Sequence, residues 1–130
     1  MAGDKNMESQ IDDLTNRIIK CIIQVHKALG PGFLENIYRN SLLIELAENN
    51  IDAETEKEIK IYYQNYEVGL HRLDILVENE VIIELKTVER LNKAHYAQIK
   101  SYLKATKLKT GILVNFAEEK ADFRRIDLFQ

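Results

Sequence analysis

Two short apolar runs in the middle of the chain carry charged residues where a buried strand should carry none. The runs cover residues 72–77 and 81–86 and are separated by three polar residues, a pattern that predicts a β-hairpin. Side chains alternate along a strand, so Glu84 and Lys86 point to one face, and Asp74 on the partner strand can share that face. Because unpaired buried charge costs several kcal/mol, such a cluster needs internal pairing or a bound ion.

Two carboxylates on neighbouring strands are a common protein contribution to a magnesium site, because hard divalent cations prefer oxygen ligands. A simpler interpretation also exists. Glu84 and Lys86 could form an ordinary ion pair or belong to a solvated strand face, and these two residues alone favour that interpretation. The residues before and after the hairpin are needed to distinguish a magnesium site from an ordinary ion pair or solvated face.

Composition limits the class of protein. The 130 residues are 45% hydrophobic and 30% charged, which predicts one globular domain over residues 11–130, preceded by a disordered N-terminus over residues 1–10. No apolar run is long enough to span a bilayer, no signal-peptide pattern is present, and we expect a cytoplasmic protein. Cys21, the single cysteine, lies in an apolar helical run and should be buried and inert. The net charge of -3 argues against tight non-specific binding to long duplex DNA.

The hydrophobic period changes from helical to alternating and back along the chain. It predicts helices over residues 9–29, 33–48 and 92–106, and strands over residues 51–63, 66–77, 81–88, 111–116 and 123–129. Ser9 and Asn92 are the expected N-caps, and Gly30-Pro31-Gly32 should end the first helix. The strand from residue 51 alternates, with the set from Ala53 to Tyr63 expected on the covered face and acidic side chains opposite in water.

The third helix has three separate faces at 100° per residue. Tyr96, Ile99 and Leu103 form an apolar stripe. The remaining positions form a polar group of His95, Gln98 and Tyr102, and, on the far side, a basic stripe of Lys93, Lys100, Lys104 and Lys107. We therefore expect the lysines to be a solvated face and not to line the same pocket as the polar group.

The start of the second helix carries a further signal. Residues 32–38 fit the pattern G-x-x-E-x-x-Y, with Glu35 in the first turn and Tyr38 three residues on. Together with Asp74, Glu84-x-Lys86 and Gln98-x-x-x-Tyr102, this pattern resembles the GxxExxY family of the PD-(D/E)XK nuclease superfamily. The last motif also resembles the Q-x-x-x-Y of RecB-like nucleases, and the likeness runs from about residue 11 to residue 126.

The resemblance implies a fold and a site. The fold would be α/β (α+β), with an α-β-β-β-α-β restriction-endonuclease-like core, a mixed sheet flanked by helices, and an extra N-terminal helix. Mg²⁺ or Mn²⁺ would be held by Asp74, Glu84 and the Leu85 backbone carbonyl, with Glu35 acting directly or through water. Lys86 would orient the attacking water and stabilise the developing charge. Gln98 would complete the catalytic set, and the implied substrate contacts are Tyr38, Arg72, His95 and Tyr102.

Three functions are compatible with these features. The first is a metal-dependent nuclease that hydrolyses DNA phosphodiester bonds. The second is a non-catalytic protein that keeps the nuclease fold and binds a protein or nucleic-acid partner. The third is a Holliday-junction-resolvase-like enzyme, against which the acidic net charge argues because such enzymes are expected to be basic dimers. A homodimer is left open, and no membrane association is expected.

Overall fold

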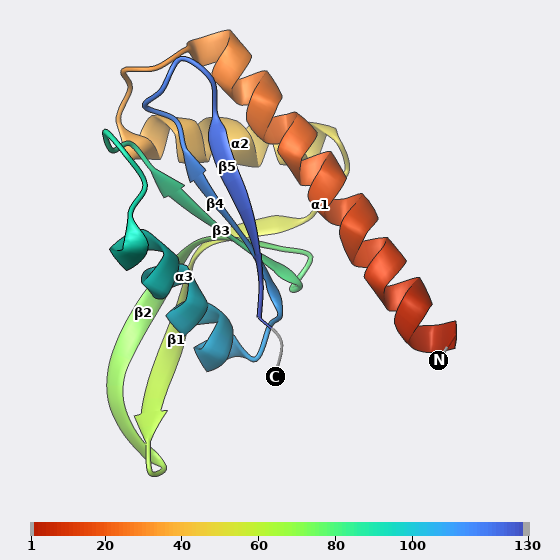
Figure 1. The fold of residues 1–130 in the computed structure, drawn as a ribbon, viewed down its shortest axis with the longest axis vertical. Helices are drawn as coiled ribbons and strands as arrows, with labels where there is room; N and C mark the ends of the chain where they lie inside the picture. Colours follow the sequence, from red (N-terminus) through yellow and green to blue (C-terminus); the bar gives the residue numbers. More distant parts are fainter. Residues whose placement is uncertain (1, 129–130) are drawn as a thin grey trace.

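The computed structural model describes residues 2–128, with side chains from Met7 onward. The elements, in chain order, are α1 (Ala2–Leu29), α2 (Glu35–Glu48), β1 (Ala53–Tyr63), β2 (Tyr66–Val77), β3 (Val81–Lys86), α3 (Lys93–Thr106), β4 (Thr110–Asn115) and β5 (Asp122–Asp127) (Figure 1). This order confirms the predicted α-β-β-β-α-β core with its extra N-terminal helix. None of the described helices combines the length and apolar character needed to cross a membrane.

The five strands form one mixed sheet in the order β1-β2-β3-β4-β5. The first three strands are antiparallel neighbours, as the predicted meander requires. β4 pairs with β3 in parallel and β5 closes the far edge in antiparallel orientation. A parallel pair needs a crossover connection, and α3 provides it.

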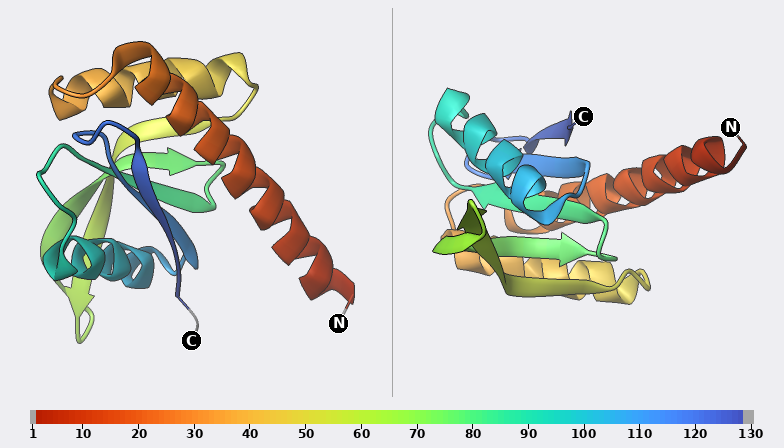
Figure 2. Two further views of the ribbon diagram at one scale, coloured as in Figure 1. Left: turned by 45° about the horizontal axis from the view of Figure 1, so that its top comes forward. Right: turned by 90° about the horizontal axis from the view of Figure 1, so that it is seen from below.

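Helices cover both faces of the sheet. α1 and α2 lie on one face and α3 lies on the other (Figure 2). β3 is the central strand, and its apolar side chains are buried on both sides. Ile83 and Leu85 pack in the core beneath α1 and α2, whereas Ile82 packs in the core beneath α3. Strand alternation therefore places Glu84 on the α3 face.

The turn between α1 and α2 fixes where α2 begins. Gly30 and Gly32 have φ values of +69° and +110°, a region that favours glycine. The Tyr38 hydroxyl donates to the Gly30 carbonyl, and the Tyr38 ring stacks on Phe116 with 4.5 Å between ring centroids. These contacts set the position of Glu35, the first residue of α2.

Two predicted details of the chain ends differ from the structure. α1 is helical from Ala2, so the predicted cap at Ser9 is wrong and Ser9 lies inside the helix. The predicted disorder of residues 1–10 stays a prediction. At the other end, the predicted last strand is β5, which ends at Asp127, and Phe129 lies outside the described residues.

β1 and β2 continue beyond the other strands as a two-stranded arm, which projects past α3 (Figure 1). The predicted covered face of β1 is therefore wrong for much of the strand, because Lys57 and Tyr63 are exposed. The predicted turn at Gln64 and Asn65 is confirmed. Both residues have positive φ, +49° and +69°, as two-residue hairpin turns of type I′ require.

Candidate active site

The candidate site lies where two strands separate. β2 and β3 are paired over three positions, ending at Ile75 opposite Ile83. β3 nevertheless continues to Lys86 in pairing with β4. Asp74 and Glu84 are the next residues of the two strands, so they face each other where the β2–β3 pairing ends, a place we call the strand fork.

At the strand fork, side chains replace the lost ladder hydrogen bonds. The Asp74 backbone N–H donates to Glu84 Oε1 at 3.3 Å, and the Leu85 N–H donates to Asp74 Oδ2 at 2.9 Å. Each carboxyl group thus accepts a backbone donor that strand separation would leave unpaired. Each keeps a second oxygen, and no hydrogen bond from a described residue reaches either of them.

Lys86 is held by α3 and not by the acids. Its Nζ donates to Gln98 Oε1 at 2.8 Å, and over the described residues no ion pair joins Lys86 to a carboxylate. The simple Glu84–Lys86 ion pair is therefore not what the structure contains. The start of α3 is fixed by a capping box, in which Asn92 accepts from the His95 N–H and His95 Nδ1 accepts from the Asn92 N–H.

Burial and charge make Glu84 an unusual acid. Only 4% of the residue is exposed, and this burial, followed by the negative charge of Asp74, raises the pKa of Glu84 to about 8. Lys86 acts in the opposite direction but does not compensate. The pKa of Tyr102 is also raised, first by burial and then by the charges of Glu84 and Asp74. Tyr102 therefore lies within electrostatic reach of the acid pair.

The geometry agrees with a sequence comparison. The sequence model of the PD-(D/E)XK nuclease superfamily matches residues 12–126, which is most of the chain and includes the whole site. The chain belongs to this superfamily. No curated protein matches it at a significant level.

A solved structure supports the superfamily fold. It is titled "Crystal structure of SSO0001", shares 24% identity with this chain and superimposes with a TM-score of 0.54. The match covers 71% of this chain and 48% of the other, so this chain spans about half the length of that protein. At this identity the likeness supports the fold alone.

The donor set at the strand fork fits the divalent cation that PD-(D/E)XK nucleases generally use. The acids of Asp74 and Glu84 each present a free oxygen, and Mg²⁺ typically takes one or two protein carboxylates with the other positions left to water and phosphate. Burial and then the charge of Asp74 raise the pKa of Glu84, and a cation would act against both by favouring the ionised acid. Within residues 7–128, whose side chains are described, no group of three His, Cys, Asp or Glu forms a metal cluster.

Glu35 lies outside the acid pair. Its carboxylate is exposed and is the weakest of the influences that raise the pKa of Glu84. Glu35 therefore does not converge with Asp74 and Glu84 as a third direct ligand. Action through water stays a prediction for this residue.

The substrate contacts implied by the resemblance have different environments. Tyr38 is fully buried and its hydroxyl holds the α1–α2 turn, so its burial gives no support to a direct substrate contact. His95 is half-buried and caps α3. Arg72 is exposed and pairs with Glu58 of β1 at 3.3 Å, two residues from Asp74. For Tyr38, Arg72 and His95 the substrate role stays a prediction.

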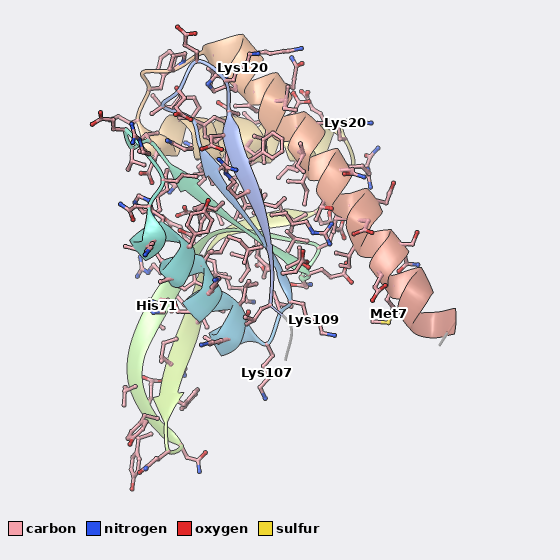
Figure 3. All side chains as sticks on the ribbon, viewed as in Figure 1. Met7, Lys20, His71, Lys107, Lys109 and Lys120 are labelled. Atoms are coloured by element: carbon pink, nitrogen blue, oxygen red, sulfur yellow. The ribbon has the colours of Figure 1, made fainter. Side chains whose placement is uncertain are left out.

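Several residues that support the site carry no signal in the sequence. Thr55 of β1 donates its hydroxyl to the Asp74 carbonyl at 2.8 Å. The His71 ring, labelled in Figure 3, lies 4.8 Å from the Tyr102 ring. Buried Asn115 donates to the Val88 carbonyl and accepts the Val88 N–H, which fixes the chain as it leaves β3 beyond Lys86. These contacts join segments that are far apart in the sequence, so no local pattern reveals them.

β1 is distorted opposite Asp74. Pairing of β1 with β2 skips Glu56, whose φ of +55° is uncommon for a residue other than glycine. The strand alternation changes at this point, since Leu73 packs in the core beneath α3 and Ile75 in the core beneath α1 and α2. The change of face accompanies the start of the arm.

Proposed function

We propose that the protein is a metal-dependent nuclease that uses Mg²⁺ or Mn²⁺ to hydrolyse phosphodiester bonds in DNA, and that it acts in the cytoplasm. Within the superfamily, the pattern from Gly32 to Tyr38 favours the GxxExxY group. One observation carries the proposal. The acids of Asp74 and Glu84 meet at the strand fork with free oxygens, beside a lysine that has no carboxylate partner among the described residues.

The protein groups have separate roles in this reaction. Asp74 and Glu84 would hold the cation, with the Leu85 carbonyl as a third oxygen ligand and Glu35 acting through water. The cation would supply Lewis-acid activation of the scissile phosphate and of the attacking water. Holding the cation also requires Glu84 to lose its proton, which the proximity of positive charge favours.

Lys86 would orient the attacking water and stabilise the negative charge that develops on the phosphate. Gln98 keeps the ammonium group in one place through the 2.8 Å hydrogen bond. Tyr102, within electrostatic reach of both acids, would contact the substrate phosphate as it enters.

The test is a cleavage assay on labelled single-stranded, duplex and branched DNA with Mn²⁺, and with EDTA as the metal-free condition. Lys86→Ala should lose cleavage, whereas Lys20→Ala, which removes an equal charge from an exposed site on α1, should retain it. Folding of each variant is checked by thermal melting. If folded wild-type protein cleaves none of these substrates, the protein is instead a non-catalytic binding protein with a nuclease fold.

A further inference from the structure

The tip of the β1–β2 arm exposes three tyrosines. Tyr62, Tyr63 and Tyr66 are 60%, 66% and 74% exposed. Tyr63 and Tyr66 are opposite each other in the pairing register, so their rings share one face of the arm, and alternation puts Tyr62 on the other. None of the three belongs to either hydrophobic core. Exposed apolar surface gathered in one place commonly marks an interaction site.

A second surface feature is basic. Residues 91–117 contain five lysines and neither Asp nor Glu, although the whole chain has a net charge of -3. All five are exposed, and within the described part of the chain none lies within ion-pair distance of an acid. They are Lys93, Lys100, Lys104, Lys107 and Lys109, and Figure 3 shows the last two at the C-terminal end of α3. We call this set the α3 lysines. Their positive charges have no acidic partner among the described residues.

The two features adjoin. A hollow of about 420 Å³ separates the arm from the C-terminal end of α3. Tyr62 and Lys60 line it from the arm, and Thr106 and Leu108 line it from the end of α3, beside Lys107 and Lys109 in the sequence. Tyr62 and the basic end of α3 therefore flank one open groove, which Glu58 also lines, whereas Tyr63 and Tyr66 lie on the other face of the arm.

We propose that the arm and the α3 lysines form a binding track for single-stranded nucleic acid. This proposal rests on the proposed nuclease function and names the substrate class. Aromatic rings that stack unpaired bases beside a positively charged groove are the usual means of holding single strands without sequence preference. Bases inside a duplex are already stacked, so Tyr62 in the groove would select unpaired segments.

A second copy of this chain fits the surface less well. A two-fold interface places the same patch of both subunits in contact, so the α3 lysines of two copies would approach each other. A polyanion instead complements them. The arm tip also lies roughly 26 Å from Asp74, taking eight residues of β2 at about 3.3 Å each. The track would therefore hold the strand at a distance from the point of cleavage.

The test is fluorescence anisotropy with labelled oligothymidylate and with a duplex of equal length, in EDTA so that cleavage cannot occur. Tyr62→Ala should weaken single-strand binding at least fivefold, the smallest change expected from losing one stacked base. Tyr62→Phe keeps the ring and should bind as wild type. Tyr62 is exposed, and thermal melting verifies that each variant is folded.

The lysines are tested by salt dependence. Lys104→Gln combined with Lys107→Gln should reduce the slope of log affinity against log salt by about 1.4, at about 0.7 for each phosphate contact of a single strand. Lys20→Gln combined with Lys120→Gln removes the same charge from exposed positions far from the arm, labelled in Figure 3, and should leave the slope unchanged.

Three outcomes would overturn the proposal. One is equal affinity for duplex and single strand. Another is unchanged binding by the tyrosine-to-alanine variant. The third is a wild-type dimer that this variant converts to monomer, which would make the arm a subunit interface. Single-strand binding with the expected losses, but without metal-dependent cleavage, would support the track and reject the nuclease function.

Discussion

Replacing Glu84 by glutamine separates a metal site from a structural acid. Glutamine keeps the oxygen that accepts the Asp74 N–H and removes the charge. Because the pKa of Glu84 is raised in the folded protein, the native state retains a proton that the unfolded chain releases. Without metal, wild-type stability should therefore fall as pH rises from about 4.5, and level off above about 8. Glu84→Gln lacks this pH dependence.

The magnitude follows from the pKa. Each pH unit between the unfolded and folded pKa values costs about 1.4 kcal/mol, which gives an upper limit of roughly 3 kcal/mol at pH 7. For a chain of this length 1 kcal/mol shifts the melting temperature by about 4 °C. In EDTA at pH 7 we expect Glu84→Gln to melt about 4–10 °C above wild type, and the difference should vanish near pH 4.

Added metal should stabilise the wild type more than it stabilises Glu84→Gln. At a Mn²⁺ concentration of about ten times its dissociation constant, mass action stabilises the wild type by about 1.4 kcal/mol. Glu84→Gln has one charged ligand fewer and should gain much less. The assay is thermal melting from about pH 4 to about pH 9 in EDTA and in Mn²⁺, a range that spans both pKa values. Glu48→Gln, an exposed acid on α2, is the control and should behave as wild type.

One pattern would refute this reasoning. If Glu84 served only as a structural hydrogen-bond acceptor with an ordinary pKa, Glu84→Gln would melt at or below wild type in EDTA at every pH. Mn²⁺ would then change neither protein. That result would exclude both the strained acid pair and the metal site at the strand fork.

The remaining predictions concern three other residues. Lys86→Ala should keep its melting temperature and its Mn²⁺ response but lose about 10²- to 10⁴-fold in kcat, measured with the DNA substrate that wild type cleaves best; unchanged kcat would reject a catalytic lysine. Gln98→Ala frees the Lys86 ammonium group and should lower kcat about tenfold. In Gln98→Glu the new carboxylate can pair with the ammonium group and should keep it in position. Tyr38→Phe removes the donor to Gly30 and should cost about 1–2 kcal/mol in urea unfolding with kcat unchanged; a large loss of kcat would instead place Tyr38 in catalysis.

The parts of this protein that depend on local pattern could be predicted from its sequence. The hairpin containing Asp74 and Glu84 and the helix capped by Asn92 are both in the structure, because period and capping are read from neighbouring residues. Alternation also puts Glu84 and Lys86 on the face covered by α3, where Gln98 lies. Strand alternation alone predicts that Glu84 and Lys86 share a face, whereas Gln98 joins them only through the family resemblance, because the helix period does not show which face α3 covers.

Local patterns were insufficient where distant segments decide the outcome. Tyr38 follows Glu35 by one helical turn, which suggested a shared role, but its ring stacks on Phe116 and is buried. Tyr102 shares the polar face of its helix with His95 and Gln98 but is only 6% exposed, because it packs in the core beneath α3. No local sequence pattern identifies the residue on which a ring stacks. No local pattern shows that β1 continues beyond the other strands as part of an arm.

The strand fork explains why the acids can serve both fold and function. In a continuous sheet, the backbone N–H groups of Asp74 and Leu85 would bond to a neighbouring strand. Because β2 leaves β3 at this point, each acid instead binds one of these donors and keeps its other oxygen free. Truncating Asp74 to alanine would thus remove a ligand and leave the Leu85 N–H unpaired, so its loss of activity could not be separated from a loss of stability. Glu84→Gln keeps the hydrogen bond and removes only the charge, and for that reason it is the substitution that tests the chemistry of this site.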